Sequence, residues 1–445
     1  MAQYDKSFIS SIHFLDKREI LSQVLDVQNE APSFLDVMEG MRRSVPTSSA
    51  VFHNYVNAPV YEQVTLTGSA AGNNLTHSSL RAGDVIVDVS NNTMWYLKAV
   101  ANLSDATKRV KLGGTGTAIA DGASIVVISN AHGEGSGAPE GLRYGLTKQS
   151  GKVQIFKNSY KLTDVELTNK VEVEFQGKPY YMYAAQHNAL NKFRNDIAHA
   201  LAFGYDHAST FSGYSNDYSD ASQAGAVGGV TGGQVTDADG NPVQFTKGLV
   251  EHCKDGLDFT GSAGDANDFV GAATLGDFGT IVTVMDQVRA PYEYLLFGGT
   301  GANIGLDNLL KNLGSSGVTS VRMNVAGTSV DYGMEQFKLY GRSFVKKAFP
   351  QFSHAAGKNA LANASDSLLF IPNDKIKVQG GSGMVDRMRV RYLESPSANL
   401  AYKEWMLGGL APTPTDGRSV LECVYESAQG LEVLGREHFG IAQFA

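Results

Sequence analysis

A glycine-punctuated, strand-rich segment at residues 81–137 constrains the fold of this chain more than any other feature. Its apolar runs predict three short strands at Val85–Val89, Met94–Val100 and Ser124–Ile128. Asn91 and Asn92 predict a tight hairpin turn between the first two strands, because Asn tolerates a positive φ. Gly113–Gly116 predicts a hinge, since a side chain there would restrict the backbone. We therefore expect a small β module inserted ahead of a different, helix-containing body.

The composition of the 445 residues sets the scale of the protein and the character of its surface. A chain of this length predicts two or three domains with ample core. Of its 445 residues 49 are glycine, or about 11%, and only 18% are charged. An average chain has about 7% glycine and about 25% charged residues. Low charge with high glycine indicates surface that contacts protein rather than water. A loop-rich β protein is the alternative explanation of the same composition.

Charge and cysteine usage exclude several function classes. The net charge of −8 argues against a protein that binds by neutralising many phosphates. The cluster Arg387, Arg389 and Arg391 is more typical of a solvated or ion-paired strand face than of a nucleic-acid site. Cys253 and Cys423 have no CxxC context, so neither a disulfide framework nor a zinc site is predicted. The sequence has no signal-peptide core and no 18-residue apolar run, which predicts a protein made and folded in a cytoplasm.

The strongest helix signal lies between Pro179 and Ala208. Its apolar residues follow the spacing of one helical face, at Leu190, Phe193, Ile197 and Leu201. Pro179 stands near the start, where a missing N–H costs least. A helix of this length is a spine against which a sheet or a neighbouring subunit can pack.

The remaining elements alternate between strands and helices. Helical pieces are predicted around Leu21–Val27, Phe34–Met41, Leu275–Arg289 and Ile304–Leu313. Strands are predicted at Tyr55–Thr67, Val153–Tyr160, Val171–Phe175, Tyr292–Phe297, Val318–Val325, Phe337–Val345, Ser367–Ile371, Arg387–Leu393, Leu421–Ser427 and Leu431–Leu434. Residues 212–236, rich in Ser, Gly, Tyr and Asp, predict a loop.

Several residues imitate the chemistry of an enzyme without supporting it. Residues 299–305 follow a predicted strand and precede a helix, but their spacing is GxGxxxG rather than the dinucleotide-binding GxGxxG. A glycine turn that caps a helix is the favoured interpretation. Paired metal-ligand histidines and a GxSxG elbow are missing from the sequence, and Glu134, Glu140 and Asp164 form no defined acid–base pair. We therefore predict no enzymatic activity, no cofactor and no metal.

Trp95 and Tyr96 lie together on a predicted strand of the β module. Core packing is the default interpretation of this pair. A partner contact is the sharper one, because aromatic residues are enriched at interfaces.

The order of these parts, with the motifs of the insertion, resembles the major capsid proteins of tailed bacteriophages, which have the Hong Kong 97-type fold. The matching stretches are Gly83–Ile86, Leu97–Val100, Gly113–Gly116, Ile125–Ile128 and Glu134–Gly135, followed by Gln154–Phe156 and Val165–Val173. The loop at residues 212–236 is no mark of the family. The family's autocatalytic crosslink also matches no Lys–Asn pair here, so that chemistry is not predicted.

The resemblance implies an α+β fold and a division of the chain. The expected parts are an N-terminal arm (1–54), an extended loop (55–152) with the β-rich insertion (81–137), a peripheral domain (153–267) with the spine helix (180–208), an axial domain (268–332), and return strands of both domains (333–445). We expect the arm and the extended loop to reach across subunit boundaries.

The resemblance also implies the function and the partners. The chain would assemble with itself into hexamers and pentamers, in the host cytoplasm, to form the icosahedral head shell of a virion. Scaffolding, portal and decoration proteins are expected partners, with weak nonspecific contact to packaged double-stranded DNA and none to a membrane. We assign Arg81, Trp95, Tyr96, Glu134 and Arg289 to subunit interfaces. The alternative function is another virion structural protein, such as a tail or baseplate component.

Overall fold

The protein has an α+β fold, as the sequence predicts, and divides into two compact units. Residues 1–53 and 150–445 form unit 1, and residues 54–149 form unit 2. The computed structural model describes residues 34–40, 43–57, 63–66, 79–89, 91–100, 105–139, 146–163, 178–205, 243–260, 274–315, 336–361, 363–377, 383–395, 398–409 and 417–444, with a few isolated positions between them.

The first sheet of unit 1 is organised by one long strand. β22 (Val420–Val433) pairs antiparallel with β9 (Gln154–Thr163) along one edge. Its other edge pairs with β21 (Lys403–Leu407) and then with β19 (Met388–Ser395). The short strands β1 (Ser44–Thr47) and β20 (Ala398–Asn399) extend β19.

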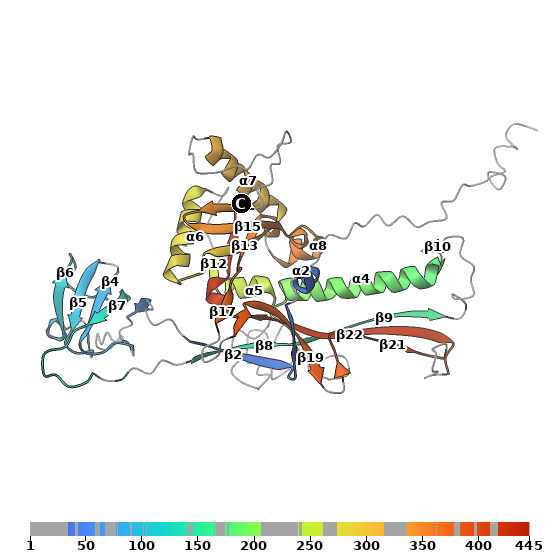
Figure 1. The fold of residues 1–445 in the computed structure, drawn as a ribbon, viewed down its shortest axis with the longest axis horizontal. Helices are drawn as coiled ribbons and strands as arrows, with labels where there is room; N and C mark the ends of the chain where they lie inside the picture. Colours follow the sequence, from blue (N-terminus) through green and yellow to red (C-terminus); the bar gives the residue numbers. More distant parts are fainter. Residues whose placement is uncertain are drawn as a thin grey trace, which may run out of the picture. The chain divides into compact units, whose positions relative to one another are not determined.

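Helix α4 (Tyr180–Phe203) runs along β9 and β22 (Figure 1). The face predicted from the sequence faces the core, because Phe193, Ile197 and Leu201 are buried and Leu190 packs against the same cluster. The Asn158 side chain of β9 donates to the Ala189 carbonyl at 2.9 Å. The helix is therefore fixed to the sheet by packing and by a cross-element hydrogen bond.

The second sheet of unit 1 has the order β12–β23–β16–β13–β15–β14. Its strands are Leu257–Phe259, Gly440–Gln443, Ser367–Pro372, Glu293–Gly298, Arg342–Ala348 and Gln336–Leu339, in that order. β13 and β15 are parallel, and α7 (Thr300–Ser315) follows β13 in the connection between them. Helix α6 (Leu275–Gln287) begins with a capping box made by Thr274 and Asp277. Phe278 and Ile281 of α6 and Leu306 of α7 join the core of this sheet.

The smaller elements of unit 1 connect these layers. They are α5 (Leu249–Lys254), α8 (Ala355–Ala360), β10 (Glu174–Phe175), β11 (Lys178–Pro179), β17 (Lys375–Lys377), β18 (Met384–Asp386), and the 3₁₀ turns η2 (Pro350–Phe352), η3 (Ala364–Asp366) and η4 (Arg436–His438). Among the described helices, none combines the length and the apolar character that crossing a membrane requires.

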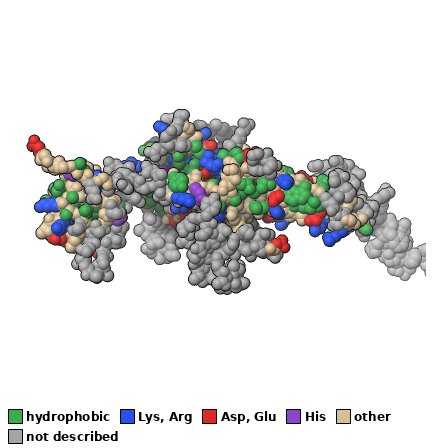
Figure 2. Space-filling model, turned by 90° about the horizontal axis from the view of Figure 1, so that it is seen from below, with side chains coloured by type: hydrophobic (Ala, Val, Ile, Leu, Met, Phe, Trp, Pro, Cys, Tyr) green, Lys and Arg blue, Asp and Glu red, His purple; other side chains and the backbone are tan. Residues whose placement is uncertain are grey.

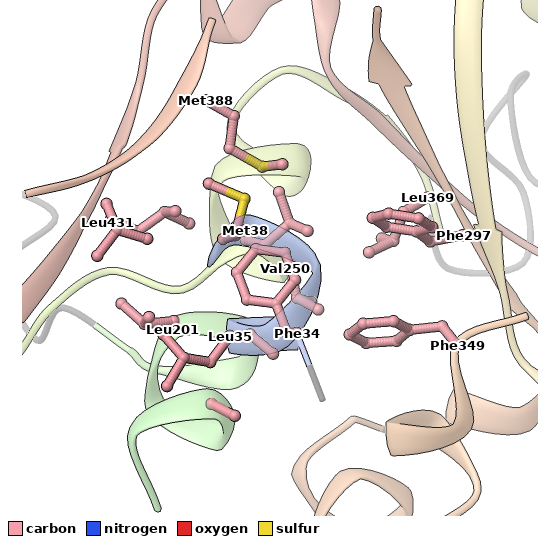
Figure 3. Packing of buried hydrophobic residues seen from close by; sticks show 14 of the residues in the cluster. Phe34, Leu35, Met38, Leu201, Val250, Phe297, Phe349, Leu369, Met388 and Leu431 are labelled. Carbon is pink, nitrogen blue, oxygen red and sulfur yellow. The ribbon is translucent and has the colours of Figure 1, made fainter. Parts of the chain in front are cut away.

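Helix α2 (Phe34–Gly40) lies at the centre of the largest core. Phe34 and Met38 are completely buried, and Leu35 is nearly so. Figure 3 shows this helix among side chains of both sheets and of two helices, namely Leu201, Val250, Phe297, Phe349, Leu369, Met388 and Leu431. The helix predicted around Phe34–Met41 therefore exists, and it belongs to the folded body.

Phe34→Ala should lower the free energy of unfolding by about 3–5 kcal/mol, because it leaves a cavity where both sheets meet. Urea denaturation followed by circular dichroism measures this. Asp36→Ala on the same helix is the matched control. Its carboxylate is 43% exposed and pairs with Arg194 at 2.8 Å, so it should cost no more than about 1 kcal/mol. Equal effects of the two variants would show that α2 only rests on the surface.

Arg342 is the largest fully buried side chain among the described residues, at 1% exposure. Its guanidinium donates to the Pro291 carbonyl and, at 3.2 Å, to the Ala290 carbonyl. It also pairs with Asp286, near the end of α6, at 2.5 Å. Arg342 thus links the start of β15 to the loop between α6 and β13. Its guanidinium is suited to this position because its several N–H groups can donate to two carbonyls and a carboxylate at once.

Arg342→Ala should destabilise the protein by about 3 kcal/mol, since it leaves buried carbonyls without donors. Arg342→Lys should recover only part of this loss, because an ammonium cannot reach both carbonyls and the carboxylate. Lys338→Ala, an exposed position on the neighbouring strand β14, is the control. A loss no larger than that of the control, in the same denaturation assay, would contradict the role assigned to Arg342.

Unit 2 folds around a core of its own. Its five-stranded sheet has the order β3–β7–β4–β5–β6, with every described pairing antiparallel. The strands are Gln63–Thr65, Ser124–Asn130, Asp84–Asp88, Thr93–Leu97 and Arg109–Gly113, in that order, with η1 (Ala106–Lys108) before β6. The strands β2 (Val51–Asn57) and β8 (Leu146–Lys152) pair at the boundary with unit 1.

The three strands and the turn predicted for the insertion are confirmed, with shifted ends. Asn92 has the expected positive φ of 45°, and Gly114 in the predicted hinge has a φ of 101°. The sequence did not predict β6. The single strand predicted at Tyr55–Thr67 corresponds to two strands. Its beginning overlaps the end of β2 at Asn57, its end contains β3, and residues 58–62 lie outside the described part.

Three further predictions needed correction. The strand predicted at Phe337–Val345 is the hairpin β14–β15, because Tyr340 and Gly341 both take a positive φ and reverse the chain. The two strands predicted at Leu421–Ser427 and Leu431–Leu434 are the single strand β22. Gly430 does not interrupt it, since a glycine is what allows the close approach of the Lys152 backbone.

The helix predicted to reach Ala208 ends at Phe203, where Gly204 leaves the helix close to the Thr246 carbonyl. The predicted helix at Leu21–Val27, the strand at Val318–Val325 and the loop at 212–236 lie outside the described residues. Of the strand predicted at Val171–Phe175, only Glu174–Phe175 is described, as β10.

Candidate subunit-interaction surfaces

The five residues assigned to interfaces belong to two different units. Arg81, Trp95, Tyr96 and Glu134 belong to unit 2, whereas Arg289 belongs to unit 1. Arg81 is half-buried, and its side chain approaches the Asp84 carboxylate at 3.8 Å. Glu134 is exposed in a turn, and Arg289 is exposed with a φ of 54° just after α6. Their roles at interfaces stay predictions.

Trp95 and Tyr96 point to opposite faces of the sheet in unit 2. Trp95 is only 4% exposed and belongs to the core of the unit. The Arg109 guanidinium lies over its ring, 4.8 Å from the centroid, and burial lowers the pKa of Arg109. Tyr96 is half-buried on the other face, where its hydroxyl donates to the Ala131 carbonyl at 3.2 Å. Of the pair, only Tyr96 lies on a surface.

In unit 1, the sheet face opposite α4 carries a ladder of charges that sequence reasoning missed. Tyr425 faces α4, with its ring 6.0 Å from that of Phe193, so alternation turns Glu422 and Glu426 to the other side of β22. Glu426 pairs with Lys157 at 3.4 Å. Glu422 pairs with Lys161 of β9 at 3.3 Å.

The third strand, β21, completes this charge ladder. Lys403 lies opposite Glu426, and Trp405 lies opposite Val424. The Lys403 ammonium is 5.2 Å from the centroid of the Trp405 ring. Figure 2 views the molecule from below and shows basic, acidic and apolar side chains interspersed at the right-hand end. Such exposed pairs contribute little stability, but a surface of alternating charge and aromatic side chains suits a protein partner.

The arginine cluster at β19, formed by Arg389, Arg391 and the preceding Arg387, makes internal ion pairs. An ion-paired strand face is one of the interpretations that the sequence favoured. Arg389 and Arg391 both reach the Glu432 carboxylate, at 2.6 and 2.7 Å. Glu432 is fully buried. Arg387 donates to Asp374 at 2.8 Å and contacts His438 at 3.0 Å. These guanidinium groups therefore hold the sheet together and leave little for a phosphate backbone.

The glycine-rich stretch 299–305 is the beginning of a helix, as favoured above. α7 starts at Thr300, so most of the stretch is helical. The Asp366 carboxylate of η3 occupies the space where a side chain at residue 301 would lie. The Thr300 hydroxyl hydrogen-bonds to Ser353 at 2.8 Å. The Asp366 carboxylate therefore occupies the N-terminal end of α7, where the phosphate of a nucleotide would otherwise bind.

Cys253, Cys423 and His252 are buried titratable groups of unit 1. Cys253 and Cys423 are both free and buried, and burial raises the pKa of each thiol. Burial lowers the pKa of His252 to about 3. Within the described ranges, no group of three His, Cys, Asp or Glu side chains is placed to hold a metal ion.

Stability should fall in acid partly through His252. Its pKa is about 3 in the native state and about 6.5 in the unfolded chain. Above pH 6.5 both states are neutral. As the pH falls from about 6.5 towards 3, only the unfolded state gains the proton, so the free energy of unfolding drops by about 1.4 kcal/mol per pH unit from this group.

Urea denaturation from pH 7 to pH 5 measures that slope in the native protein and in His252→Gln. In His252→Gln the free energy of unfolding should depend less steeply on pH, because the unfolded variant takes up one proton fewer than the unfolded native chain. The slope should decrease by about 1.4 kcal/mol per pH unit. Identical slopes in native protein and His252→Gln would refute the assignment. Lys247, Asp255 and Arg436 are the charges that influence this imidazole.

Comparison with known proteins gives no family model and no curated protein that matches this chain. Similar solved structures include the capsid of a native GTA particle, 9% identical over 100% of both chains, with a TM-score of 0.41. Another is the capsid of cyanophage P-SCSP1u, 13% identical over 97% of this chain and 94% of that chain, with a TM-score of 0.40. A third is the SrpI encapsulin complex of Synechococcus elongatus, 8% identical over 67% and 77%, with a TM-score of 0.34.

Because the identities and TM-scores are low, no residue role is transferred from these structures. We base the function on the arrangement of the elements in this chain.

Proposed function

We propose that this chain is the major capsid protein of a tailed bacteriophage, with the Hong Kong 97-type fold. It would assemble into hexamers and pentamers that form the icosahedral head shell around the double-stranded DNA genome. The observation that carries this proposal is the long helix α4 laid along the β9–β22 ladder, beside an α/β sheet. A second unit with its own core, entered and left through the β2–β8 pair, completes the set of parts.

The chemistry of the described residues suits a structural role. The charged clusters are engaged in ion pairs, and the buried thiols have raised pKa values. The sheet face of unit 1 that carries the charge ladder offers Lys157, Glu426 and Trp405 to a protein neighbour. A shell is built from large complementary surfaces of this type.

The partners follow from the same proposal. Scaffolding, portal and decoration proteins would bind the assembling shell in the host cytoplasm, and the virion is its final location. Contact with packaged DNA would be weak and nonspecific, because a chain of net charge −8 gains little from the release of counterions.

Residues 1–33 precede the buried helix α2, so any arm that reaches a neighbour must come from this part of the chain. A truncation of residues 1–33 should leave a folded subunit that forms no closed shells. A truncation that continues to residue 40 is no test of assembly, because it also removes Phe34, Leu35 and Met38 from the core.

Negative-stain electron microscopy with light scattering, on the full chain and on the truncated chain, checks both statements. Closed shells, or rings of five and six subunits, from the full chain would support the proposal. Tubes or stacked rings would favour the tail or baseplate alternative. A monomer in both samples calls for the same experiment with the neighbouring virion proteins added. Normal shells from the truncated chain would exclude an essential arm.

A further inference from the structure

The sheet of unit 2 has a second apolar face in addition to its core face. Ile86, Trp95 and Ile125 point into the core. Side chains alternate along a strand, so the residues next to these point to the opposite face of the sheet. The register places Val87 opposite both Met94 and Val126, and these three residues therefore share that opposite face. The apolar and aromatic residues of this outer face are Val85, Val87, Met94, Tyr96, Val110 and Val126, and Ser129 lies opposite Val85 on the same face.

An antiparallel sheet with one solvated face normally alternates apolar and polar residues. The outer face of unit 2 departs from this rule, since none of these residues is charged. Met94 is 38% exposed and Val110 is 37% exposed, while Leu112, at the bulge beside them, is 54% exposed. Val85 is already buried in the single chain, at 7% exposure, so the uncovered part of the face is the apolar area around Met94 and Val110, where a further layer can pack.

The charge of unit 2 favours a second copy as the covering layer. Residues 54–149 contain seven acidic and seven basic side chains, so the unit is formally neutral, while the whole chain carries −8. A neutral unit approaches its own copy without the repulsion that the rest of the chain would impose. An uncharged face is also complementary to itself, as a twofold contact requires.

The size of the face predicts a weak contact between isolated chains. Four strands about 4.8 Å apart and about 17 Å long give roughly 330 Å² per copy, or about 650 Å² for the pair, below the roughly 1,000 Å² of a stable interface. Such a contact becomes effective when other contacts already hold the two copies close together.

We propose that the outer face of the unit 2 sheet packs on the same face of unit 2 in a second copy, as two stacked sheets. The inference extends the proposed function, because a shell is what would supply the high local concentration. The contact itself is a property of unit 2, and it can be detected or excluded whether or not shells form.

Thiol crosslinking of the full chain tests the proposal. Val87 is on β4, the central strand of the sheet, so Val87→Cys lies close to its own copy in a twofold stack. Lys111→Cys is the matched control, because Lys111 is exposed on the edge strand β6 and alternation directs it away from the outer face. The native cysteines are both buried, so a short bis-maleimide reports on the new thiol.

We expect several-fold more crosslinked dimer from Val87→Cys than from Lys111→Cys, in concentrated solution and further increased in any assembled particles. Adding Val110→Lys to Val87→Cys should remove the crosslink, because it places a charge in an apolar contact. Circular dichroism on each variant confirms that it is folded. Should Val87→Cys misfold, Val126→Cys, on the neighbouring strand β7, replaces it.

Equal yields at the two positions, or no dimer from Val87→Cys, would overturn the inference. Protection of the Val87→Cys thiol only after a different virion protein is added would assign the face to that protein instead. Closed shells without the crosslink would refute this contact and leave the proposed function standing. Crosslinked dimers in a protein that forms no shell or ring with its virion partners would support this contact and refute the proposed function.

Discussion

The antiparallel ladder between β22 and β9 is the constraint on which the rest of unit 1 depends. The register runs without a break from Val420 opposite Thr163 to Gln429 opposite Gln154. One side of this ladder receives α4, and the other side carries the charge ladder. Beyond it, β22 continues into pairing with β19 and then passes through η4 into β23 of the second sheet. The two sheets of unit 1 are therefore linked by one continuous stretch of chain that runs from β22 through η4 to β23.

Buried polar groups fix the point where the chain passes from one sheet to the other. Glu432 near the end of β22 is held between Arg389 and Arg391. A few residues further on, His438 contacts Arg387 and the Val288 carbonyl. A buried carboxylate costs desolvation and needs both guanidinium groups to offset it. Such a network adds little net stability, and its effect is to specify one arrangement of the two sheets.

The sequence was sufficient for the elements with a strong internal period. The spacing of Phe193, Ile197 and Leu201 predicted the buried face of α4, since a helix repeats over many residues. It was insufficient where tertiary contacts decide. β6 contains Arg109 and Lys111 and does not read as a strand, yet it completes the sheet because the Arg109 guanidinium stacks on Trp95. Gly430 reads as a break, although the approach of another backbone requires a glycine there.

The candidate surfaces were harder to predict than the fold for the same reason. Trp95 and Tyr96 are adjacent in sequence, but the two-residue repeat of a strand sends one into the core and the other outward. The partners of the charge ladder, Lys157 and Glu426, lie far apart in the chain, and only the register of β9 on β22 brings them together. Sequence patterns report on local periodicity, whereas an interface depends on which distant strands become neighbours.

The distribution of charge limits how tightly this chain could bind a nucleic acid. In the described part of the chain, cations are repeatedly matched to a carboxylate: Arg389 and Arg391 to Glu432, Arg342 to Asp286, and Lys157 to Glu426. A cation that is already paired must break its ion pair before it can neutralise a phosphate, so its contribution to DNA affinity is small. For the proposed shell subunit such weak adhesion to the contents is suitable, because adhesion between copies must exceed it.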